Sequence, residues 1–283
     1  MMTGNRIMLL DTSELADKDL FAGFYKKMST ERKNKIDALK VESAKRLSLG
    51  AGILLEKALA EAGIVVAGAA SGAEAPYRIA FGPQGKPYIE GSQDFFFNLS
   101  HSGSMVAIAV SDREVGVDIQ KLRHFDERLS NYVFNIEDRE FAKELLARYD
   151  IASVQDRDGA SDMASVQDRD GASNMDYIYT RMWAMKESVM KHNGKGLAME
   201  PQKIVLRLDD GAAARGNGVS EAKNSSGGQF FSKIRVSHPG YDCEKLFIHD
   251  YSCSGVDGSF YGIAVCSEYE EFCPPDFCSL NLG

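Results

Sequence analysis

The 283-residue sequence lacks an apolar segment long enough to cross a membrane as a helix. The longest apolar run, Ile64 to Ala70, is short and is interrupted by Gly68. The apolar run near the start, Ile7 to Leu10, is too short for the core of a secretory signal peptide. We therefore expect a soluble cytoplasmic protein.

Cysteine is scarce and is confined to the last part of the chain, where it occupies Cys243, Cys253, Cys266, Cys273 and Cys278. An odd number of cysteines, no Cys-x-x-Cys pair and no secretion signal argue against a disulfide framework. A zinc site that combines some of these thiols with His238 and His249 stays open, although the spacing fits no familiar zinc pattern. Free thiols, buried or at the surface, account for the pattern better.

The chain also has no excess of positive charge. Asp and Glu number 41 against 33 Lys and Arg, which gives a net charge of −8. Because nucleic-acid-binding proteins favour a basic face, this balance argues against general nucleic-acid binding. Hydrophobic residues make up 44% of the chain, so it can bury a sizeable core in two modest domains or one large one.

Residues Arg181 to Gly196 have the pattern of a helix. Three apolar side chains recur at helical spacing and predict a buried face: Met182, Met185 and Val189. A second line along the helix holds Trp183, Glu187 and Lys191. Gly194 tolerates the left-handed conformation in which many helices end. Glu187 and Lys191 alone would indicate only a surface ion pair, but a second segment supplies further polar partners.

That second segment contains two predicted strands, Met105 to Val110 and Val115 to Gln120, joined by a polar turn. The first is continuously apolar, as in a buried strand. In the second, alternation places Val117 and Ile119 on one face, and the opposite face carries Gly116, Asp118 and Gln120. We expect an acid and an amide to project together, with Gly116 leaving room for a ligand.

Other segments have weaker patterns. We predict helix from Glu31 to about Glu61, as one helix or as two that meet near Leu49 and Gly50, with Ser29 or Thr30 as the N-cap. A second helical pattern runs from Asp126 to Tyr149, with a polar side formed by Asp138, Arg139, Glu140, Lys143 and Glu144. Further strands are predicted at residues 7–10, 77–81, 204–208, 230–236, 246–251 and 260–265, and Phe95, Phe96 and Phe97 are expected in a strand core.

A tandem duplication follows the second helical pattern. Residues Ala152–Met163 and Ala164–Met175 are identical except that Asp162 becomes Asn174. The unit is polar and has few residues to bury, and two copies of this short period are too few for a solenoid. Its alternating acids resemble half of a calcium loop, but the closing bidentate Glu is missing. We predict a flexible surface insertion at about residues 151–176.

Four motifs carry a resemblance, in this order: Gly85-Lys86-Pro87, then Phe97 to Ser102, then Gly116 to Ile119, then Trp183 to Ser188 with Lys191 and Gly194-Lys195-Gly196. Each motif alone is weak. Together and in order they make the chain similar to the 4′-phosphopantetheinyl transferases of the surfactin-synthetase (Sfp) type. The resemblance runs from about Ser29 to Val265 and leaves the duplication and the C-terminal tail unexplained.

The resemblance implies an α+β fold, a pseudo-dimer of two similar α/β subdomains with the active site in the cleft between them. We expect an N-terminal subdomain at residues 1–112 and a C-terminal subdomain at residues 113–283, the latter containing the insertion. One observation from the residues agrees with two similar halves. Gly258 to Val265 repeats the form of Gly103 to Val110, with a Gly-Ser start and an apolar run.

The resemblance also implies a function. Such enzymes transfer 4′-phosphopantetheine from coenzyme A to a serine of an apo acyl, peptidyl or aryl carrier protein, with Mg²⁺, and release adenosine 3′,5′-bisphosphate. The expected activity is therefore that of a holo-[acyl-carrier-protein] synthase. The expected partners are carrier proteins or carrier domains of fatty-acid, polyketide or non-ribosomal peptide synthases. We expect no nucleic acid and no membrane as partner, and a monomeric enzyme.

Residue roles follow from the matched motifs. Asp118 and Glu187 are the implied Mg²⁺ ligands, with Glu187 or a water it holds as base and Lys191 as the cation beside the breaking pyrophosphate. Coenzyme A would be bound by these three residues together with Arg46, Lys86, Pro87, Asn98, Ser100 and His101. Ser100 and His101 do not form a nucleophilic dyad, because neighbours on an extended chain point in opposite directions.

The chain departs from the family at Gln120, where many relatives carry a second acid. An amide oxygen can ligate Mg²⁺ but adds no charge, so Gln120 is expected as a weak ligand or as a neighbour of the metal. Two alternatives stay open. A non-catalytic coenzyme A-binding relative would keep the phosphate anchors without the metal and base, and a metal-dependent phosphohydrolase would use the same acids with water.

Overall fold

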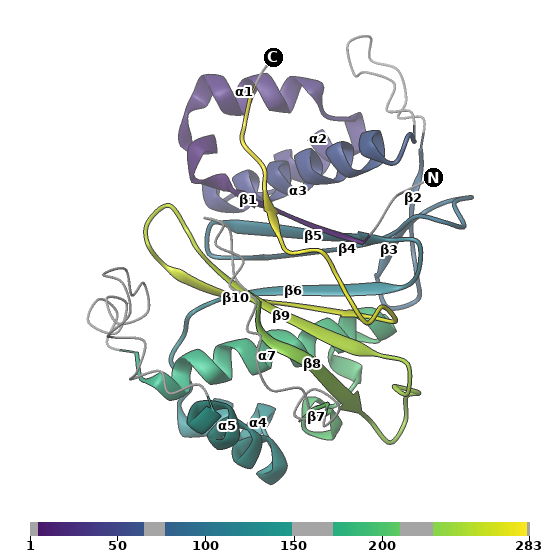
Figure 1. Cartoon of the computed structure of the whole chain (residues 1–283). Helices are drawn as coiled ribbons and strands as arrows, with labels where there is room; N and C mark the ends of the chain where they lie inside the picture. The colour runs from purple at the N-terminus through teal and green to yellow at the C-terminus, as the bar shows by residue number, and fades with distance from the viewer. Residues whose placement is uncertain (1–4, 65–76, 149–171, 210–228, 282–283) are drawn as a thin grey trace.

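The computed structural model describes residues 5–64, 77–148, 172–209 and 229–281, and these form four layers (Figure 1). Helices α1–α3 cover one sheet, a second sheet packs against the first, and helices α4, α5 and α7 cover the outer face of the second sheet. The mixed α and β composition agrees with the predicted α+β class. No helix within these ranges has the length and apolar character needed to cross a membrane.

The first sheet has the strand order β11-β1-β5-β4. It is formed by β1 (Arg6–Asp11), β4 (Phe96–Ser102), β5 (Met105–Ser111) and the short β11 (Asp276–Phe277). β5 is antiparallel to both β1 and β4, and β11 adds to β1 in parallel. In β1, Met8 packs toward the helices and Ile7 toward the second sheet, so both faces of the strand are buried.

The helices on this sheet follow η1 (Thr12–Ala16) and are α1 (Lys18–Lys27), α2 (Thr30–Asp37) and α3 (Glu42–Glu61). Ser29 caps α2 as predicted. The predicted break near Leu49–Gly50 is wrong, because the helices separate at residues 38–41 and Gly50 lies inside α3. A Cβ on Gly50 would lie 2.6 Å from Cγ2 of Thr12 in η1 and 3.3 Å from Cδ2 of Leu10 in β1, so this glycine lets α3 approach both elements.

The second sheet has the order β6-β10-β9-β8-β7 and is antiparallel throughout. Its strands are β6 (Val115–Lys121), β7 (Val205–Leu208), β8 (Gln229–Ser237), β9 (Phe247–Ser254) and β10 (Phe260–Ser267). The two similar segments noted in the sequence become β5 and β10, and each follows a glycine of positive φ, Gly103 at 56° and Gly258 at 77°. The likeness of the two halves as wholes remains a prediction.

The helices on the second sheet differ from the sequence prediction in two ways. The single helix expected over residues 126–149 is divided into α4 (Glu127–Val133) and α5 (Ile136–Arg148). The prediction that Asp138 lies on a polar, exposed face is wrong. Asp138 is buried at 1% exposure, where it pairs with Lys186. Helix α7 (Asn174–Asn193) begins earlier than Arg181 and ends at Gly194, whose φ is 75°. Two 3-10 turns, η4 (Gly196–Ala198) and η5 (Pro201–Lys203), follow it.

Three apolar clusters fill the spaces between the layers. One lies between α1–α3 and the first sheet, one between the two sheets, and one between the second sheet and α4, α5 and α7. The predicted core role of the three phenylalanines is confirmed: Phe95 and Phe97 lie in the first cluster, and Phe96 packs against the second. All five cysteines are free thiols, and Cys243, Cys253 and Cys266 are buried.

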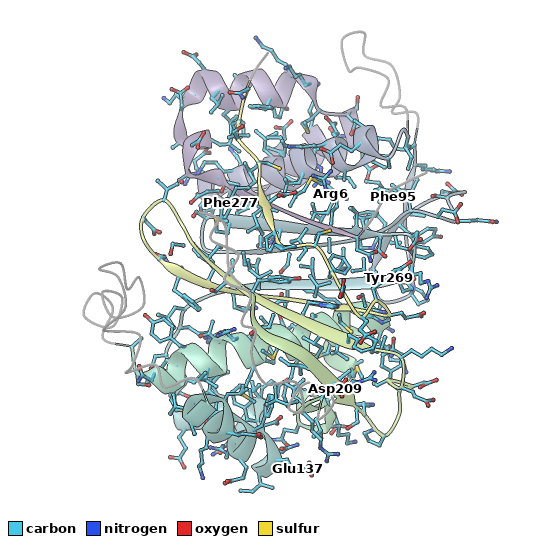
Figure 2. All side chains as sticks on the ribbon, viewed as in Figure 1. Arg6, Phe95, Glu137, Asp209, Tyr269 and Phe277 are labelled. Carbon is cyan, nitrogen blue, oxygen red and sulfur yellow. The ribbon has the colours of Figure 1, made fainter. Side chains whose placement is uncertain are left out.

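The chain passes from the first sheet to the second between Ser111 and Val115, close to the predicted boundary at residue 112. The C-terminal tail then returns to the first sheet, where β11 with Phe277 lies beside β1 with Arg6 (Figure 2). Arg6 pairs there with Asp276. The division into two subdomains stays a prediction. A two-stranded hairpin, β2 (Ile79–Phe81) and β3 (Pro87–Ile89), completes the elements. Up to residue 171 the predicted insertion lies outside the described residues. Its predicted end at about residue 176 is too late, because Ser173 already caps α7, which begins at Asn174.

Candidate active site

Helix α7 lies unusually close to strand β6, and Gly116 is the reason. A Cβ at this position would lie 2.1 Å from the carbonyl oxygen of Ser188 and 2.4 Å from the backbone nitrogen of His192. The expectation that Gly116 leaves room for a ligand is therefore wrong, because the backbone of α7 fills that space. Asp118 and Gln120 lie on the same face of β6 as Gly116, so this close approach brings them within hydrogen-bond distance of side chains on α7.

The rotation of α7 about its axis is fixed by a buried lysine. Lys186 is fully buried, and its Nζ lies 2.5 Å from a carboxylate oxygen of Asp138 on α5. It also donates to the carbonyl oxygens of Pro201 at 2.9 Å and Ile204 at 2.8 Å. Trp183, Glu187 and Lys191 are partly exposed along one line of α7, and from this line Glu187 and Lys191 reach residues of β6.

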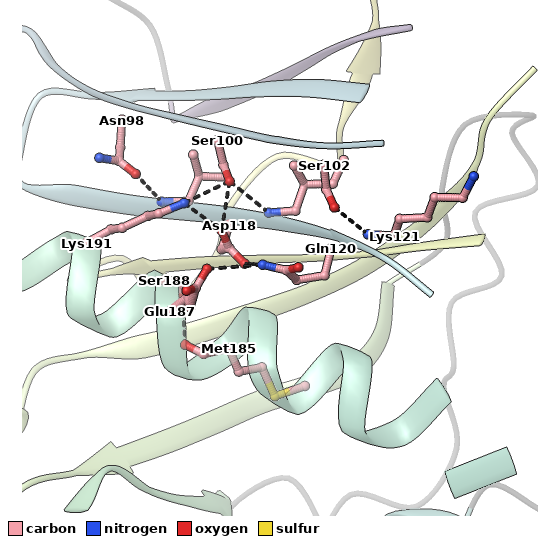
Figure 3. Close-up of polar contacts among 12 residues, drawn as sticks. Asn98, Ser100, Ser102, Asp118, Gln120, Lys121, Met185, Glu187, Ser188 and Lys191 are labelled. Carbon is pink, nitrogen blue, oxygen red and sulfur yellow. Dashed lines mark hydrogen bonds and ion pairs between the residues drawn. The ribbon is translucent and has the colours of Figure 1, made fainter. Parts of the chain in front are cut away.

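The predicted acid, amide and lysine meet in one cluster (Figure 3). Asp118 is 1% exposed, and its Oδ1 accepts from Lys191 Nζ at 2.5 Å and from Ser100 Oγ at 2.7 Å. Its Oδ2 accepts from Nε2 of Gln120 at 2.8 Å, and the same amide nitrogen donates to Oε2 of Glu187 at 3.1 Å. Two carboxylates thus converge on one amide group, with an ammonium group on the far side of Asp118.

The electrostatics of the cluster favour an added positive charge. Burial, followed by the nearby Asp118 carboxylate, raises the pKa of Glu187 to about 8, while Lys191 opposes the shift. The oxygens of Asp118 and Glu187 are the hard donors that Mg²⁺ prefers, so the residues fit this metal. Gln120 points its NH₂ group at both carboxylates and would have to turn its amide to offer Oε1. Among the described residues, no three His, Cys, Asp or Glu side chains form a metal-binding group, so protein carboxylates alone do not complete a coordination shell.

Strand β4 supports the cluster from the first sheet. Asn98 Oδ1 accepts from the N–H of Val117 at 3.0 Å, and Ser100 Oγ accepts from the N–H of Ile119 at 3.3 Å. Asn98 and Ser100, implied by the resemblance to bind coenzyme A, therefore lie between the two sheets, where their polar groups bind other parts of the protein. Both are buried, at 5% and 6% exposure.

Lys86 and Pro87 lie at the C-terminal end of α7, away from the acid cluster. Lys86 Nζ contacts Glu114 Oε2 at 2.5 Å and donates to the carbonyl oxygens of Val115 at 3.1 Å and His192 at 3.0 Å. A pocket of about 340 Å³ opens beside them. Its lining comes from both sides of residue 112, with Gly82, Pro83, Gln84, Lys86, Pro87, Tyr88, Ile89, Ser92, Phe95, Phe96, Phe97, Glu114, Asn193 and Gly194.

His101 and Arg46, the other two residues implied to bind coenzyme A, make no hydrogen bond to the acid cluster among the described residues. His101 lies at the end of β4, where burial and the charge of Lys191 lower its pKa, so it is within electrostatic reach of the cluster. Arg46 lies near the start of α3, where its charge acts on Glu42. The hydrogen bonds of the described residues do not connect Arg46 to the cluster.

Two structurally important residues were not assigned roles from the sequence. Lys186 lies within the apolar face formed by Met182, Met185 and Val189, and a lysine at such a position is a detectable sign of a buried ion pair. Ser102 binds the N–H of Lys121 at 3.0 Å and continues the pattern of Asn98 and Ser100. The alternation of Asn98, Ser100 and Ser102 along one strand was the available signal for a shared face.

Comparison with known proteins finds similarity to one family. Residues 114–244 match the model of the 4′-phosphopantetheinyl transferase superfamily. A 4′-phosphopantetheinyl transferase of Bacillus subtilis is 27% identical over 200 residues, which cover 70% of this chain and 67% of the relative. The Sfp transferase of Bacillus subtilis strain 168 is 32% identical over 124 residues, 44% of each chain. The AcpT transferase of Salmonella typhi is 44% identical over 59 residues, which cover 20% of this chain and 31% of AcpT.

These matches confirm the resemblance to 4′-phosphopantetheinyl transferases, Sfp among them, that the four motifs predict. The match spans about two thirds of the first relative and less than half of Sfp and AcpT. The superfamily model covers the segment that contains both β6 and α7, and hence Asp118, Gln120, Glu187 and Lys191.

Proposed function

We propose that this protein transfers the 4′-phosphopantetheine group of coenzyme A to a serine hydroxyl of an apo carrier protein. The observation that carries the proposal is the cluster of Asp118, Gln120, Glu187 and Lys191, formed where two family motifs meet. Similarity to proteins named 4′-phosphopantetheinyl transferase supports the reaction class.

In the proposed reaction the serine oxygen attacks the phosphorus that carries the pantetheine arm. A new P–O bond forms to serine, the pyrophosphate P–O bond breaks, and adenosine 3′,5′-bisphosphate leaves. Glu187 takes the proton of the serine hydroxyl, directly or through a water it holds.

The charge that develops on the breaking pyrophosphate needs cations. Lys191 supplies an ammonium group that Asp118 and Ser100 already hold in place, so little reorganisation is required when the charge appears. Mg²⁺, held by Asp118 and Glu187 with Gln120 as a weak ligand or a neighbour, would neutralise further charge on the pyrophosphate. Burial of Asp118 keeps water away from these contacts and strengthens them.

The nucleotide end of coenzyme A is proposed to bind through Lys86, Pro87, Arg46 and His101. The pocket of about 340 Å³ beside Lys86 and Pro87 offers aromatic and apolar walls for a base. Lys86 is paired with Glu114, so a phosphate at Lys86 would have to compete with that carboxylate. The partners would be carrier proteins or carrier domains of fatty-acid, polyketide or non-ribosomal peptide synthases, met by a monomeric enzyme in the cytoplasm.

The proposal is tested by incubating a panel of apo carrier proteins with this protein, coenzyme A and Mg²⁺ and recording intact mass. At least one carrier should gain the mass of one phosphopantetheine group, and a chelator of divalent cations should prevent the gain. Coenzyme A cleavage without any carrier would instead indicate a phosphohydrolase. Binding of coenzyme A with neither outcome would indicate a non-catalytic relative.

A further inference from the structure

Strands β4 and β6 belong to different sheets, yet three β4 side chains hold the two edges together. Asn98, Ser100 and Ser102 accept from the N–H groups of Val117, Ile119 and Lys121. We call this row of three bonds the seam. Each bond joins residues 19 positions apart in the sequence, so the register between β4 and β6 is constant along the seam. These side chains therefore do for two sheets what a backbone ladder does within one, because each satisfies a strand N–H that would otherwise lack a partner.

Only the middle member of this seam also touches the acid cluster. Ser100 Oγ accepts from Ile119 N–H at 3.3 Å and from Lys191 Nζ at 2.8 Å, and it donates to Asp118 Oδ1 at 2.7 Å. A hydroxyl has one donor and two acceptor positions, so all its capacity is used. At 6% exposure, Ser100 could contact a phosphate only by giving up one of these internal bonds.

The orientation of the Asp118 carboxylate is set by its bonds to Ser100, Lys191 and Gln120. Oδ1 is occupied by Ser100 and Lys191, which leaves Oδ2 facing Gln120 and Glu187. Without the Ser100 hydroxyl the carboxylate would keep Lys191 on Oδ1 and Gln120 on Oδ2. Both partners are the ends of long side chains, so they would hold the last torsion of Asp118 less tightly than the short Ser100 side chain does. Outer contacts of this type orient metal-binding carboxylates in many proteins.

We propose that Ser100 is a positioning residue that turns Oδ2 of Asp118 toward the cation, whereas Asn98 and Ser102 only join the two sheets. The inference rests on the proposed function for the identity of the metal site. It differs from the role implied by the family resemblance, in which Ser100 contacts the coenzyme directly.

The chain offers a matched control at Ser102. It is the same residue type on the same strand and makes the same bond to a β6 N–H, at 3.0 Å. Its partner residue Lys121 directs its side chain to Asp257 at the surface, away from the acid cluster. Loss of either hydroxyl removes one seam bond, but only loss of the Ser100 hydroxyl also removes a contact to Asp118.

The test measures Mn²⁺ binding by electron paramagnetic resonance to the full chain without coenzyme A, for wild type, Ser100→Ala, Ser100→Thr and Ser102→Ala. Mn²⁺ favours the same oxygen ligands as Mg²⁺. Loss of an outer contact typically weakens metal affinity by about 10-fold to 100-fold, and we expect this range for Ser100→Ala. Ser102→Ala should bind Mn²⁺ like wild type, and Ser100→Thr, which keeps the hydroxyl, should recover most of the affinity. Both alanine variants should stay folded, and Ser100→Ala should lower the unfolding midpoint more, because its hydroxyl also bonds Asp118 and Lys191.

Equal Mn²⁺ affinity in Ser100→Ala and Ser102→Ala would overturn the inference. So would a Ser100→Ala variant that binds coenzyme A more weakly in metal-free buffer and keeps its Mn²⁺ affinity, since Ser100 would then be a coenzyme ligand. Failure of the proposed function is a separate result. Wild type would bind Mn²⁺ with the expected dependence on Ser100 yet modify no carrier protein.

Discussion

Replacing Gly116 by alanine is the sharpest single perturbation of the site. The added methyl group would lie 2.1 Å from the carbonyl oxygen of Ser188, 2.4 Å from the nitrogen of His192 and 2.9 Å from its Cα. All three are backbone atoms of α7, so no side chain can rotate away. Because real Cβ atoms stay at least 3.0 Å from such neighbours, α7 must recede from β6 by about 0.9 Å.

This displacement predicts two measurable losses. Overpacking of a core typically costs about 1–3 kcal/mol in the free energy of unfolding, and we expect the upper end because only backbone can yield. The shift also moves Glu187 and Lys191 away from Asp118, and a misplacement of about 1 Å can cost about 100-fold in turnover. Gly116→Ala should therefore be less stable and nearly inactive, even at temperatures where it stays folded.

The assay is urea unfolding together with the rate of carrier-protein modification, measured below the unfolding midpoint. Gly240→Ala is the control, since its added Cβ would meet only the His238 ring, at 3.5 Å from Cε1 and 3.7 Å from Nδ1, which are ordinary contacts. It should match wild type in both measurements. Wild-type turnover in Gly116→Ala would refute the argument that the contact between α7 and β6 sets the geometry of the cluster.

Three further predictions concern the surroundings of the site. Lys186→Met should lower the free energy of unfolding by about 3–5 kcal/mol in urea titrations, because it leaves the buried Asp138 carboxylate unpaired; a loss near zero would show that the pair is dispensable. Deleting Ala164–Met175 should leave the unfolding midpoint unchanged, because the remaining copy places Ser161, Asp162 and Met163 directly before Asp176 and so restores the cap of α7. Ser173→Ala in the full chain should cost about 1 kcal/mol, and a large loss on deletion alone would contradict this reasoning. In Mg²⁺ titrations of carrier-protein modification, Asp118→Ala should be nearly inactive, whereas Gln120→Ala should stay active. Gln120→Glu should reach half its maximal rate at a lower Mg²⁺ concentration, because the added carboxylate places one more negative charge beside the cation. Equal loss of activity in the two alanine variants would make Gln120 a full ligand.

The polar cluster was largely predictable from sequence because local periodicity governs it. Alternation in a strand placed Asp118 and Gln120 on one face, and helical spacing aligned Glu187 with Lys191. Both patterns depend only on residues a few positions apart. The family resemblance then supplied the step that periodicity cannot, namely that the two segments pack against each other.

The supporting contacts were not predictable because they join distant segments through residues that have other common uses. Asp138 has the sequence context of a solvent-exposed helical acid, and only the fold brings Lys186 to it across 48 residues. Gly116 is equally compatible with a ligand or with a close helix, and the position of α7 decides between them. Asn98 and Ser100 carry polar groups that suit a coenzyme or a strand N–H equally well.

The central claim is that this cluster moves phosphopantetheine from coenzyme A to a carrier protein, and a stoichiometry measurement tests it most directly. One apo carrier protein is incubated with the wild-type protein, coenzyme A and Mg²⁺, and modified carrier and adenosine 3′,5′-bisphosphate are quantified in the same samples. We predict one bisphosphate released for each carrier modified, no release without carrier, and neither product with Glu187→Ala. Bisphosphate release that does not depend on the carrier, or carrier modification that survives Glu187→Ala unchanged, would contradict the account.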